Sequence, residues 1–222
     1  MVPPLVLDID GTLTRTDDWG LDPRIFDPIH EWDAPVVLAT GKSFPYPVGL
    51  AQFIGIRPRV VAENGGVVYA NERVDITADH EAVQGFLAAY EADYQLGWGA
   101  ADVVNRWRET DVVIHRDEPV EPIRALAEEY GLVVADSGYA YHVMDPDLSK
   151  GVGVRTLGER GEIDLEQAVA IGDSETDVPM FEAVGHGVAV ANADAAAKAA
   201  ADEVLERGHA EGTADLLERL SG

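Results

Sequence analysis

Short apolar runs alternate with amphipathic stretches along this chain. Three such runs lie early, at residues 4–8, 35–40 and 59–70, and two follow late, at 168–173 and 187–192. Near-continuous apolar runs of this length, separated by helices, are typical of parallel strands that are covered on both faces. The pattern therefore predicts the α/β fold class, with a doubly wound parallel sheet as its core.

A block from residue 72 to residue 146 has a rhythm of its own. Its two helical patterns, over 79–95 and 120–130, each place apolar side chains on one face. We interpret the block as a smaller α/β domain inserted into a core domain of residues 1–71 and 147–222; one continuous sheet is the alternative. The strand-like runs of the block are RVDI at 73–76, DVVIHR at 111–116, LVVADSG at 132–138 and AYHVMD at 140–145.

Two further helices are predicted near the carboxyl end. The alanine-rich stretch 193–202 has a high helix propensity. A last helix is predicted near 213–220, and Thr213 is a suitable N-cap for it.

The composition allows a large core and excludes several kinds of chemistry. Of the 222 residues, 46% are hydrophobic, which suffices for one large domain or two small ones. The absence of cysteine excludes disulfides, thiolate nucleophiles and cysteine metal sites. The opening MVPPLVLDIDG lacks the basic segment of a signal peptide, and no apolar run is long enough to span a bilayer. We therefore expect a cytoplasmic protein.

Acidic residues greatly outnumber basic ones, with 41 Asp and Glu against 16 Lys and Arg and a net charge of −25. Nucleic acids and anionic membranes are bound through Lys and Arg, so neither is an expected partner. The excess also makes a compact chain repel itself unless salt screens the charges, and at 1 M ionic strength the Debye length is only about 3 Å. We therefore expect a halophilic protein.

Polar residues stand where the predicted core strands end. In an open α/β sheet, ligands bind beyond the carboxyl ends of the strands, so these residues would meet at one edge. If the first strand continues through Asp10, its carboxylate points the same way as that of Asp8. Two carboxylates about 4 Å apart repel by about 4 kcal/mol at an effective dielectric constant of 20. The strand-end residues are Asp8 and Asp10, Thr40 and Gly41, Glu63 and Asn64, and Asp173 and Asp177.

A divalent cation would relieve this repulsion. Oxygen ligands without His or Cys favour Mg²⁺ over zinc, and a small number of carboxylates leaves coordination places for water and phosphate oxygens. Gly11 would let backbone N–H groups approach an anion closely, and Thr12 and Thr40 supply hydroxyl donors. Acids, a hard cation and anion donors together indicate phosphate chemistry.

Four motifs, in this order, resemble those of the haloacid dehalogenase superfamily. They are DIDGTLT at 8–14, Thr-Gly at 40–41, LSKGVGV at 148–154 and GDSETD at 172–177. Most members of this superfamily are Mg²⁺-dependent phosphatases with a Rossmann-like core. The resemblance therefore implies a phosphomonoester hydrolase whose partner is a small-molecule phosphate ester.

The resemblance also implies roles for individual residues. Asp8 would be the nucleophile that forms an aspartyl-phosphate, and Asp10 would act as general acid and then general base. Thr40 and Lys150 would hold the phosphoryl oxygens. The implied substrate-binding set is completed by Gly11, Thr12 and Gly41, and the implied Mg²⁺ ligands are Asp8, the backbone carbonyl of Asp10 and Asp173, with Asp177 close behind.

The inserted block resembles the C2-type α/β cap of one subgroup, which closes over the site and selects the substrate. The ENGG segment at 63–66 fits that subgroup. Within this subgroup, the chain resembles archaeal-type phosphoglycolate phosphatases in its compact length. This resemblance implies hydrolysis of 2-phosphoglycolate to glycolate and phosphate. A sugar-phosphate or mannosyl-phosphoglycerate phosphatase and a non-catalytic Mg²⁺- or phosphate-binding regulatory protein remain alternatives. Relatives are often dimers, so a homodimer is allowed.

Some residues depart from the pattern of the superfamily. Thr176 stands where many relatives carry Asn, and Lys42 where many carry Arg, so the support of the metal and the phosphate side of the site are less well defined. In the block, Arg106 and Arg108 flank Trp107. They could contact a substrate carboxylate, although a surface ion pair is the commoner role of such arginines.

Overall fold

The computed structural model describes residues 2–18 and 20–222, which contain two sheets. The larger sheet consists of β1 (Leu5–Asp8), β2 (Val36–Ala39), β3 (Arg59–Ala62), β4 (Val67–Ala70), β5 (Arg73–Ile76), β9 (Val169–Gly172), β10 (His186–Ala189) and β11 (Glu203–Val204). Their order across the sheet is β11-β10-β9-β1-β2-β3-β4-β5. The strands from β11 to β3 pair in parallel, which confirms the predicted doubly wound core.

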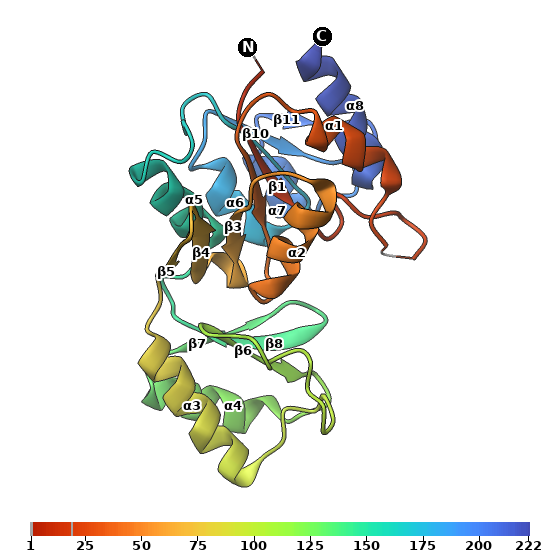
Figure 1. Ribbon diagram of the computed structural model, residues 1–222. Helices are drawn as coiled ribbons and strands as arrows, with labels where there is room; N and C mark the ends of the chain where they lie inside the picture. Colours follow the sequence, from red (N-terminus) through yellow and green to blue (C-terminus); the bar gives the residue numbers. More distant parts are fainter. Residues whose placement is uncertain (1, 19) are drawn as a thin grey trace.

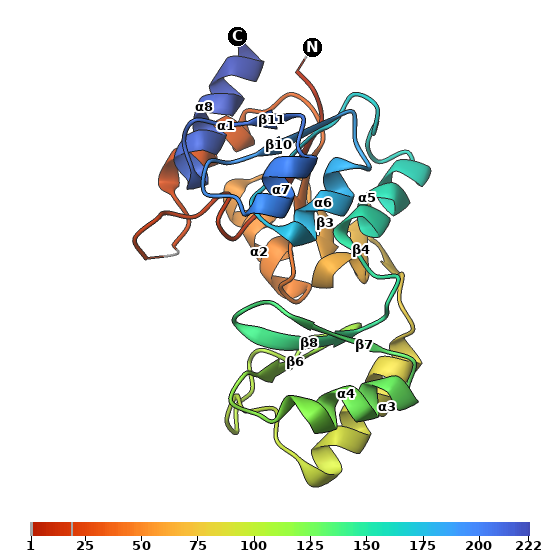
Figure 2. The ribbon, with the colours of Figure 1, turned by 180° about the vertical axis from the view of Figure 1, so that it is seen from behind.

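Helices cover both faces of this sheet, as Figure 1 and Figure 2 show. One face carries α1 (Phe26–His30), α2 (Pro45–Ile54) and α8 (His209–Ser221), and the other carries α5 (Lys150–Glu159), α6 (Val178–Phe181) and α7 (Ala195–Ala200). Because both faces are covered, every residue of the central strand β1 is buried. Within the described part of the chain, no helix has the length and apolarity that a membrane span requires.

The β5 edge of the larger sheet differs from the prediction. β4 pairs antiparallel with β3, and β5 pairs antiparallel with β4, so the sheet is mixed rather than wholly parallel. The pattern of the sequence placed the strand at 73–76 in the inserted block, which was wrong. The reason is a two-residue turn at Asn71 and Glu72, both left-handed (φ 52° and 61°), which folds β5 directly back on β4. The limits 72 and 146 of the inserted domain otherwise stay a prediction.

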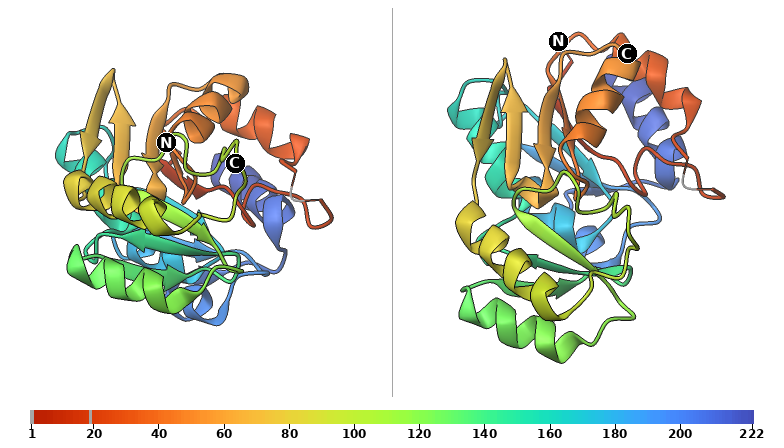
Figure 3. Two further views of the ribbon diagram at one scale, coloured as in Figure 1. Left: turned by 90° about the horizontal axis from the view of Figure 1, so that it is seen from below. Right: turned by 60° about the horizontal axis from the view of Figure 1, so that its bottom comes forward.

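The second sheet has helices on one face only. It consists of β6 (Asp111–His115), β7 (Val133–Asp136) and β8 (Ala140–Met144) in the antiparallel order β6-β8-β7, with α3 (His80–Asp93) and α4 (Val120–Glu129) beside it. Val112, Ile114 and Val143 pack in one apolar cluster with residues of these helices. Residues that alternate with them, such as Asp111 and His142, therefore lie on the opposite face. That face is turned toward the larger sheet (Figure 1, Figure 3).

The carboxyl-terminal helices are both present, but one begins earlier than predicted. The alanine-rich stretch forms α7, capped by Asp194, whose Oδ1 accepts a hydrogen bond from the Ala197 N–H (2.8 Å). Helix α8 begins at His209, so Thr213 lies inside the helix and is not its N-cap. The Thr213 hydroxyl donates instead to the backbone carbonyl of Thr12 (2.8 Å). This contact, between residues far apart in sequence, holds α8 against the loop after β1.

Candidate active site

Two carboxylates and one ammonium meet at the carboxyl end of β1. Asp8 ends this strand, and Lys150 is the first residue of α5, whose N-cap is Ser149. The Lys150 ammonium lies 2.6 Å from Asp8 Oδ1 and 2.6 Å from Asp177 Oδ1. All three side chains are buried. The fold thus brings together residues from three distant segments in one ion-paired group.

Asp173 and Asp177 both come from the segment that follows β9. Asp177 ends the short 3-10 turn η3 (Glu175–Asp177), and its Oδ2 accepts hydrogen bonds from the backbone N–H groups of Asp173 (2.9 Å) and Ser174 (3.0 Å). Asp8, Asp173 and Asp177 each place a carboxylate oxygen within 4.8 Å of the other two. Such a cluster of carboxylate oxygens can hold a hard divalent cation.

Gly11 makes room for one of these carboxylates. Its φ of +80° lies in the left-handed region, and a Cβ at this position would be 1.9 Å from Asp173 Oδ2. Any other residue would therefore suffer backbone strain and push the Asp173 carboxylate aside.

The carboxylates carry more negative charge than one ammonium offsets. Burial raises the pKa of Asp8 to about 8, and Asp177 and Asp173 add to this rise although Lys150 opposes it. Burial and Asp177 likewise raise the pKa of Asp173 to about 7. Burial would lower the pKa of Lys150, but Asp177 and Asp8 outweigh it and hold that pKa above its usual value. Among the described residues, Asp8 Oδ2 is buried without a hydrogen-bond partner.

Asp10 pairs with Lys42 and not with Lys150. β1 ends at Asp8, so the alternation that would align the two carboxylates stops before Asp10. The Asp10 side chain is 42% exposed, and its Oδ2 lies 2.6 Å from the Lys42 ammonium. The sequence presented Lys42 only as a departure from relatives, whereas the structure makes it the partner of Asp10.

The predicted substrate-binding residues lie in the loops after β1 and β2. The N–H of Gly11 donates within its own loop (2.9 Å), and the buried hydroxyl of Thr12 has no partner among the described residues. The Thr40 hydroxyl accepts a hydrogen bond from the backbone N–H of Lys42 (3.1 Å). Its own proton can therefore be donated to another group. Gly41 faces Asn64, because a Cβ at Gly41 would be 3.0 Å from Asn64 Oδ1.

Asn192 is a residue of the site that sequence reasoning missed. Its amide nitrogen lies 3.0 Å from the backbone carbonyl of Gly11 and 3.4 Å from Asp173 Oδ2, and its amide oxygen accepts from the His209 N–H at the start of α8. The clue was available, since Asn192 ends the apolar run 187–192 as the other strand-end residues end theirs. It braces the Gly11 loop against Asp173.

Glu63 joins the larger sheet to the inserted block. It begins the 3-10 turn η2 (Glu63–Gly65) with a left-handed φ of 50°, and it is fully buried. Its Oε2 accepts from the N–H of Glu109 (2.9 Å) and from the N–H and hydroxyl of Thr110 (2.8 and 2.9 Å). Its backbone N–H donates to the carbonyl of Lys42 (3.0 Å). Burial raises the pKa of Glu63 despite these donors.

A second charged group lies on the core-facing side of the smaller sheet. Asp111 is buried, and its Oδ2 is 2.8 Å from both Arg108 Nη1 and His142 Nδ1. Burial would raise the pKa of Asp111, but His142 and Arg108 outweigh it and hold that pKa below its usual value. Arg108 therefore forms an ion pair, but the pair is buried and is not the surface pair that the sequence favoured. Arg106 is exposed and lies over the Trp107 ring, 5.8 Å from its centroid.

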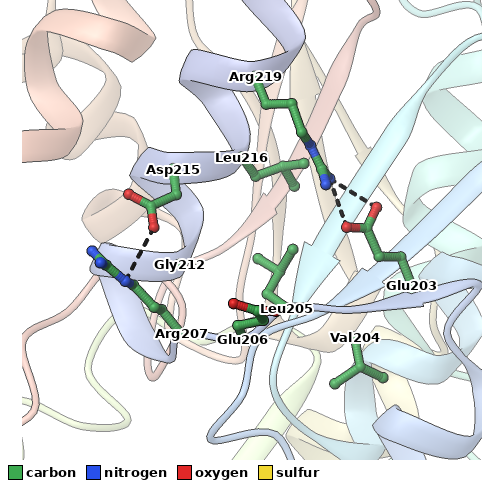
Figure 4. A pocket seen from close by; sticks show the side chains of 9 residues that line it. All are labelled: Glu203, Val204, Leu205, Glu206, Arg207, Gly212, Asp215, Leu216 and Arg219. Atoms are coloured by element: carbon green, nitrogen blue, oxygen red, sulfur yellow. Dashed lines mark hydrogen bonds and ion pairs between the residues drawn. The ribbon is translucent and has the colours of Figure 1, made fainter.

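A groove of about 360 Å³ lies between β11 and α8, and Figure 4 shows the side chains that line it. Its arginines are already paired, Arg207 with Asp215 (3.4 Å) and Arg219 with Glu203 (2.6 Å). None of the predicted site residues lines this groove. It is therefore separate from the carboxylate group at β1.

Known proteins resemble this chain over most of its length. The sequence model of the haloacid dehalogenase-like hydrolases matches residues 5–94 and 112–217. A protein of Natronomonas pharaonis named phosphoglycolate phosphatase is 50% identical over 222 residues, which cover 99% of this chain and 98% of the relative. One of the same name from Archaeoglobus fulgidus is 35% identical over 220 residues, 97% of this chain and 96% of that one. A crystal structure from Thermoplasma acidophilum superposes with a TM-score of 0.82 at 27% identity, covering 100% of this chain and 99% of that chain.

The chain therefore belongs to the haloacid dehalogenase-like hydrolase family. Within that family it is an enzyme of the phosphatase type, like the relatives that match it from end to end.

Proposed function

We propose that this phosphatase is a Mg²⁺-dependent phosphomonoester hydrolase that acts on 2-phosphoglycolate through an aspartyl-phosphate intermediate. The observation that carries the proposal is the arrangement of Asp8. Lys150 holds its Oδ1 at 2.6 Å, while its Oδ2 has no partner in the described part of the chain. A carboxylate that is fixed by one oxygen can attack phosphorus with the other.

The residues present fit a divalent cation. Three carboxylates converge within 4.8 Å, and burial together with the charges of Asp177 and Asp173 raises the pKa of Asp8 to about 8, so a cation here would favour its ionised form near neutral pH. Asp8, Asp173 and the backbone carbonyl of Asp10 would hold Mg²⁺. Because both oxygens of Asp177 already accept hydrogen bonds, we expect it to position Lys150 and Asp173 while staying within reach of the ion. When bound, Mg²⁺ would offset the charge of the carboxylates and the phosphoryl group.

In the first step, an oxygen of Asp8 forms a bond to phosphorus as the bond from phosphorus to the leaving alkoxide breaks. Asp10 donates its proton to that alkoxide. Its exposed position suits this role, since the carboxyl group must reach the leaving oxygen, and Lys42 holds it by one oxygen only (2.6 Å). Thr40 and Lys150 would donate to the phosphoryl oxygens, where negative charge collects.

In the second step, Asp10 removes a proton from a water molecule, whose oxygen attacks the phosphorus. The bond between phosphorus and Asp8 then breaks, which releases inorganic phosphate and restores the carboxylate. The same side chain therefore serves as acid and base in turn, so its loss should stop both steps.

The substrate part of the proposal is supported by the full-length relatives. Proteins of Natronomonas pharaonis and Halobacterium salinarum, both named phosphoglycolate phosphatase, are 50% and 47% identical to this chain. The acidic excess of the chain, a net charge of −25, supports activity at high salt. We extend the proposal to a halophilic enzyme of the cytoplasm.

The test is phosphate release from 2-phosphoglycolate and other phosphomonoesters in molar KCl, with and without Mg²⁺. Asp8→Asn and Asp10→Asn should each abolish turnover, whereas Asp17→Asn should not. The last variant is the matched control, because it makes the same change at a side chain that is 83% exposed. If the wild type releases no phosphate from any ester, the proposal fails and a binding protein without turnover takes its place. Turnover without Mg²⁺ would refute the metal dependence alone.

A further inference from the structure

The side chains of Arg108, Asp111 and His142, which we call the cap triad, form a largely buried polar group on the smaller sheet. They come from the segment before β6, from β6 and from β8. Asp111 and His142 lie on the face of the smaller sheet that carries no helix. Even a paired group of buried charges is often no more stabilising than apolar residues of similar volume, so a triad at this position points to a role beyond stability.

The triad leaves two donors free. A single oxygen, Asp111 Oδ2, accepts from Arg108 Nη1 and His142 Nδ1, both at 2.8 Å. In the part of the chain that the structure describes, Arg108 Nη2 and His142 Nε2 have no hydrogen-bond partner, and neither is among the fully buried unpaired atoms. Since both side chains bind the same oxygen, the guanidinium and the imidazole are neighbours on this face.

The triad also lies next to the catalytic loops. Thr110, the neighbour of Asp111, donates two hydrogen bonds to Glu63 Oε2 (2.8 and 2.9 Å). The backbone of Glu63 is bonded in turn to Lys42, the partner of Asp10. Arg108 is close enough to Glu63 to oppose the rise of its pKa. The face that carries the triad is turned toward the larger sheet, as Figure 1 and Figure 2 show.

We propose that the free nitrogens of Arg108 and His142, held by Asp111, bind the carboxylate of the substrate and so make the enzyme selective for phosphomonoesters that carry a second anionic group. This proposal rests on the function proposed above. A planar carboxylate has two oxygens that can accept from donors of both side chains, and a guanidinium is well suited to it. Asp111 is a positioning residue, because its Oδ2 holds both partners and its Oδ1 is buried.

The test compares two esters of nearly equal size, 2-phosphoglycolate and 2-hydroxyethyl phosphate, which differ in that a neutral CH₂OH group replaces the carboxylate. The wild type should prefer 2-phosphoglycolate in kcat/KM. His142→Ala and Arg108→Gln should each reduce this preference by about tenfold or more, mainly through KM, because each removes a hydrogen bond to a charged group. Their kcat/KM for 2-hydroxyethyl phosphate should stay within about twofold of the wild-type value.

Controls separate binding from a structural role. Arg106→Gln changes the same charge on an exposed neighbour, so the preference should stay unchanged. His142→Gln keeps a side-chain donor and should recover part of the preference. If Arg108→Gln does not fold, as judged by circular dichroism, Arg108→Lys replaces it, because it keeps the charge but not the two-pronged donor.

Three results would overturn the proposal. If the variants lose kcat/KM equally on both esters, the triad is structural. If the variants keep the wild-type kcat/KM on both esters, the triad does not touch the substrate. A wild type that hydrolyses both esters with equal kcat/KM would refute the carboxylate subsite while leaving the phosphatase in place. A wild type that releases no phosphate from either ester, or from any other, would refute the proposed function itself.

Discussion

Replacing Gly11 with alanine should separate activity from stability. The added Cβ would lie 1.9 Å from Asp173 Oδ2, and real Cβ atoms essentially never come closer than 3.0 Å to another heavy atom, so a movement of about 1.1 Å is required. The Asp173 carboxylate is the end of a short side chain and can rotate away. A displacement of about 1 Å in a catalytic site can cost on the order of 100-fold in rate. We therefore expect Gly11→Ala to lose about 100-fold in kcat/KM and to need more Mg²⁺ for half-maximal activity.

The stability of the same variant should fall only by the backbone strain. A residue other than glycine in the left-handed region costs about 1–2 kcal/mol, and for a chain of this size 1 kcal/mol corresponds to about 2–4 °C in Tm. Gly161→Ala is the matched control, because Gly161 has a φ of +70° but nothing within 4 Å of an added Cβ. It should lose similar stability and keep its activity.

The assays are thermal unfolding and phosphate release in molar KCl over a series of Mg²⁺ concentrations. The reasoning would be refuted if Gly11→Ala kept its kcat/KM and its Mg²⁺ requirement within about twofold of the wild type. It would also fail if Gly161→Ala lost activity to the same extent, since the effect would then come from strain and not from Asp173.

Three further predictions concern the hydrogen bonds between Glu63 and the inserted block, stability in acid, and the effect of salt on stability. Glu63→Ala should leave three hydrogen-bond donors unpaired, each at a cost of about 1–3 kcal/mol in stability, and so speed amide hydrogen exchange at Thr110. Unchanged exchange would contradict the role of Glu63 in holding Thr110. Because the pKa of Asp111 is held below its ordinary value, its contribution to stability is complete above about pH 4 and is lost as the pH falls through the folded-state pKa. Denaturant unfolding of Asp111→Asn between pH 6 and 2.5 should therefore show a weaker loss than the wild type, and parallel curves would contradict the pairing with His142 and Arg108. Finally, Tm should rise as KCl screens the net charge of −25, and a Tm independent of KCl would rule out self-repulsion as a destabilising term.

The residues of the candidate site could be named from the sequence because their signal is local. An apolar run that stops at a carboxylate marks the end of a strand, and parallel strands place their carboxyl ends at one edge. Asp8, Thr40 and Asp173 follow this rule, and so does Asn192, although it was overlooked. Local signals could not show that Asp10 pairs with Lys42, since that depends on how the loops after β1 and β2 lie together.

Hydrophobic periodicity by itself determined the α/β class, the core strands and the helices of the inserted block, because burial of one or both faces imposes a period that is visible along the chain. The tertiary structure decided which charges meet. Three contacts join residues that are far apart in the sequence: Lys150 and Asp8 are separated by 142 positions, Glu63 and Thr110 by 47, and Asp111 and His142 by 31. These pairs depend on the packing of two sheets and on the register between β6 and β8. Such long-range geometry leaves no periodic trace in the sequence, and it controls the chemistry of this site.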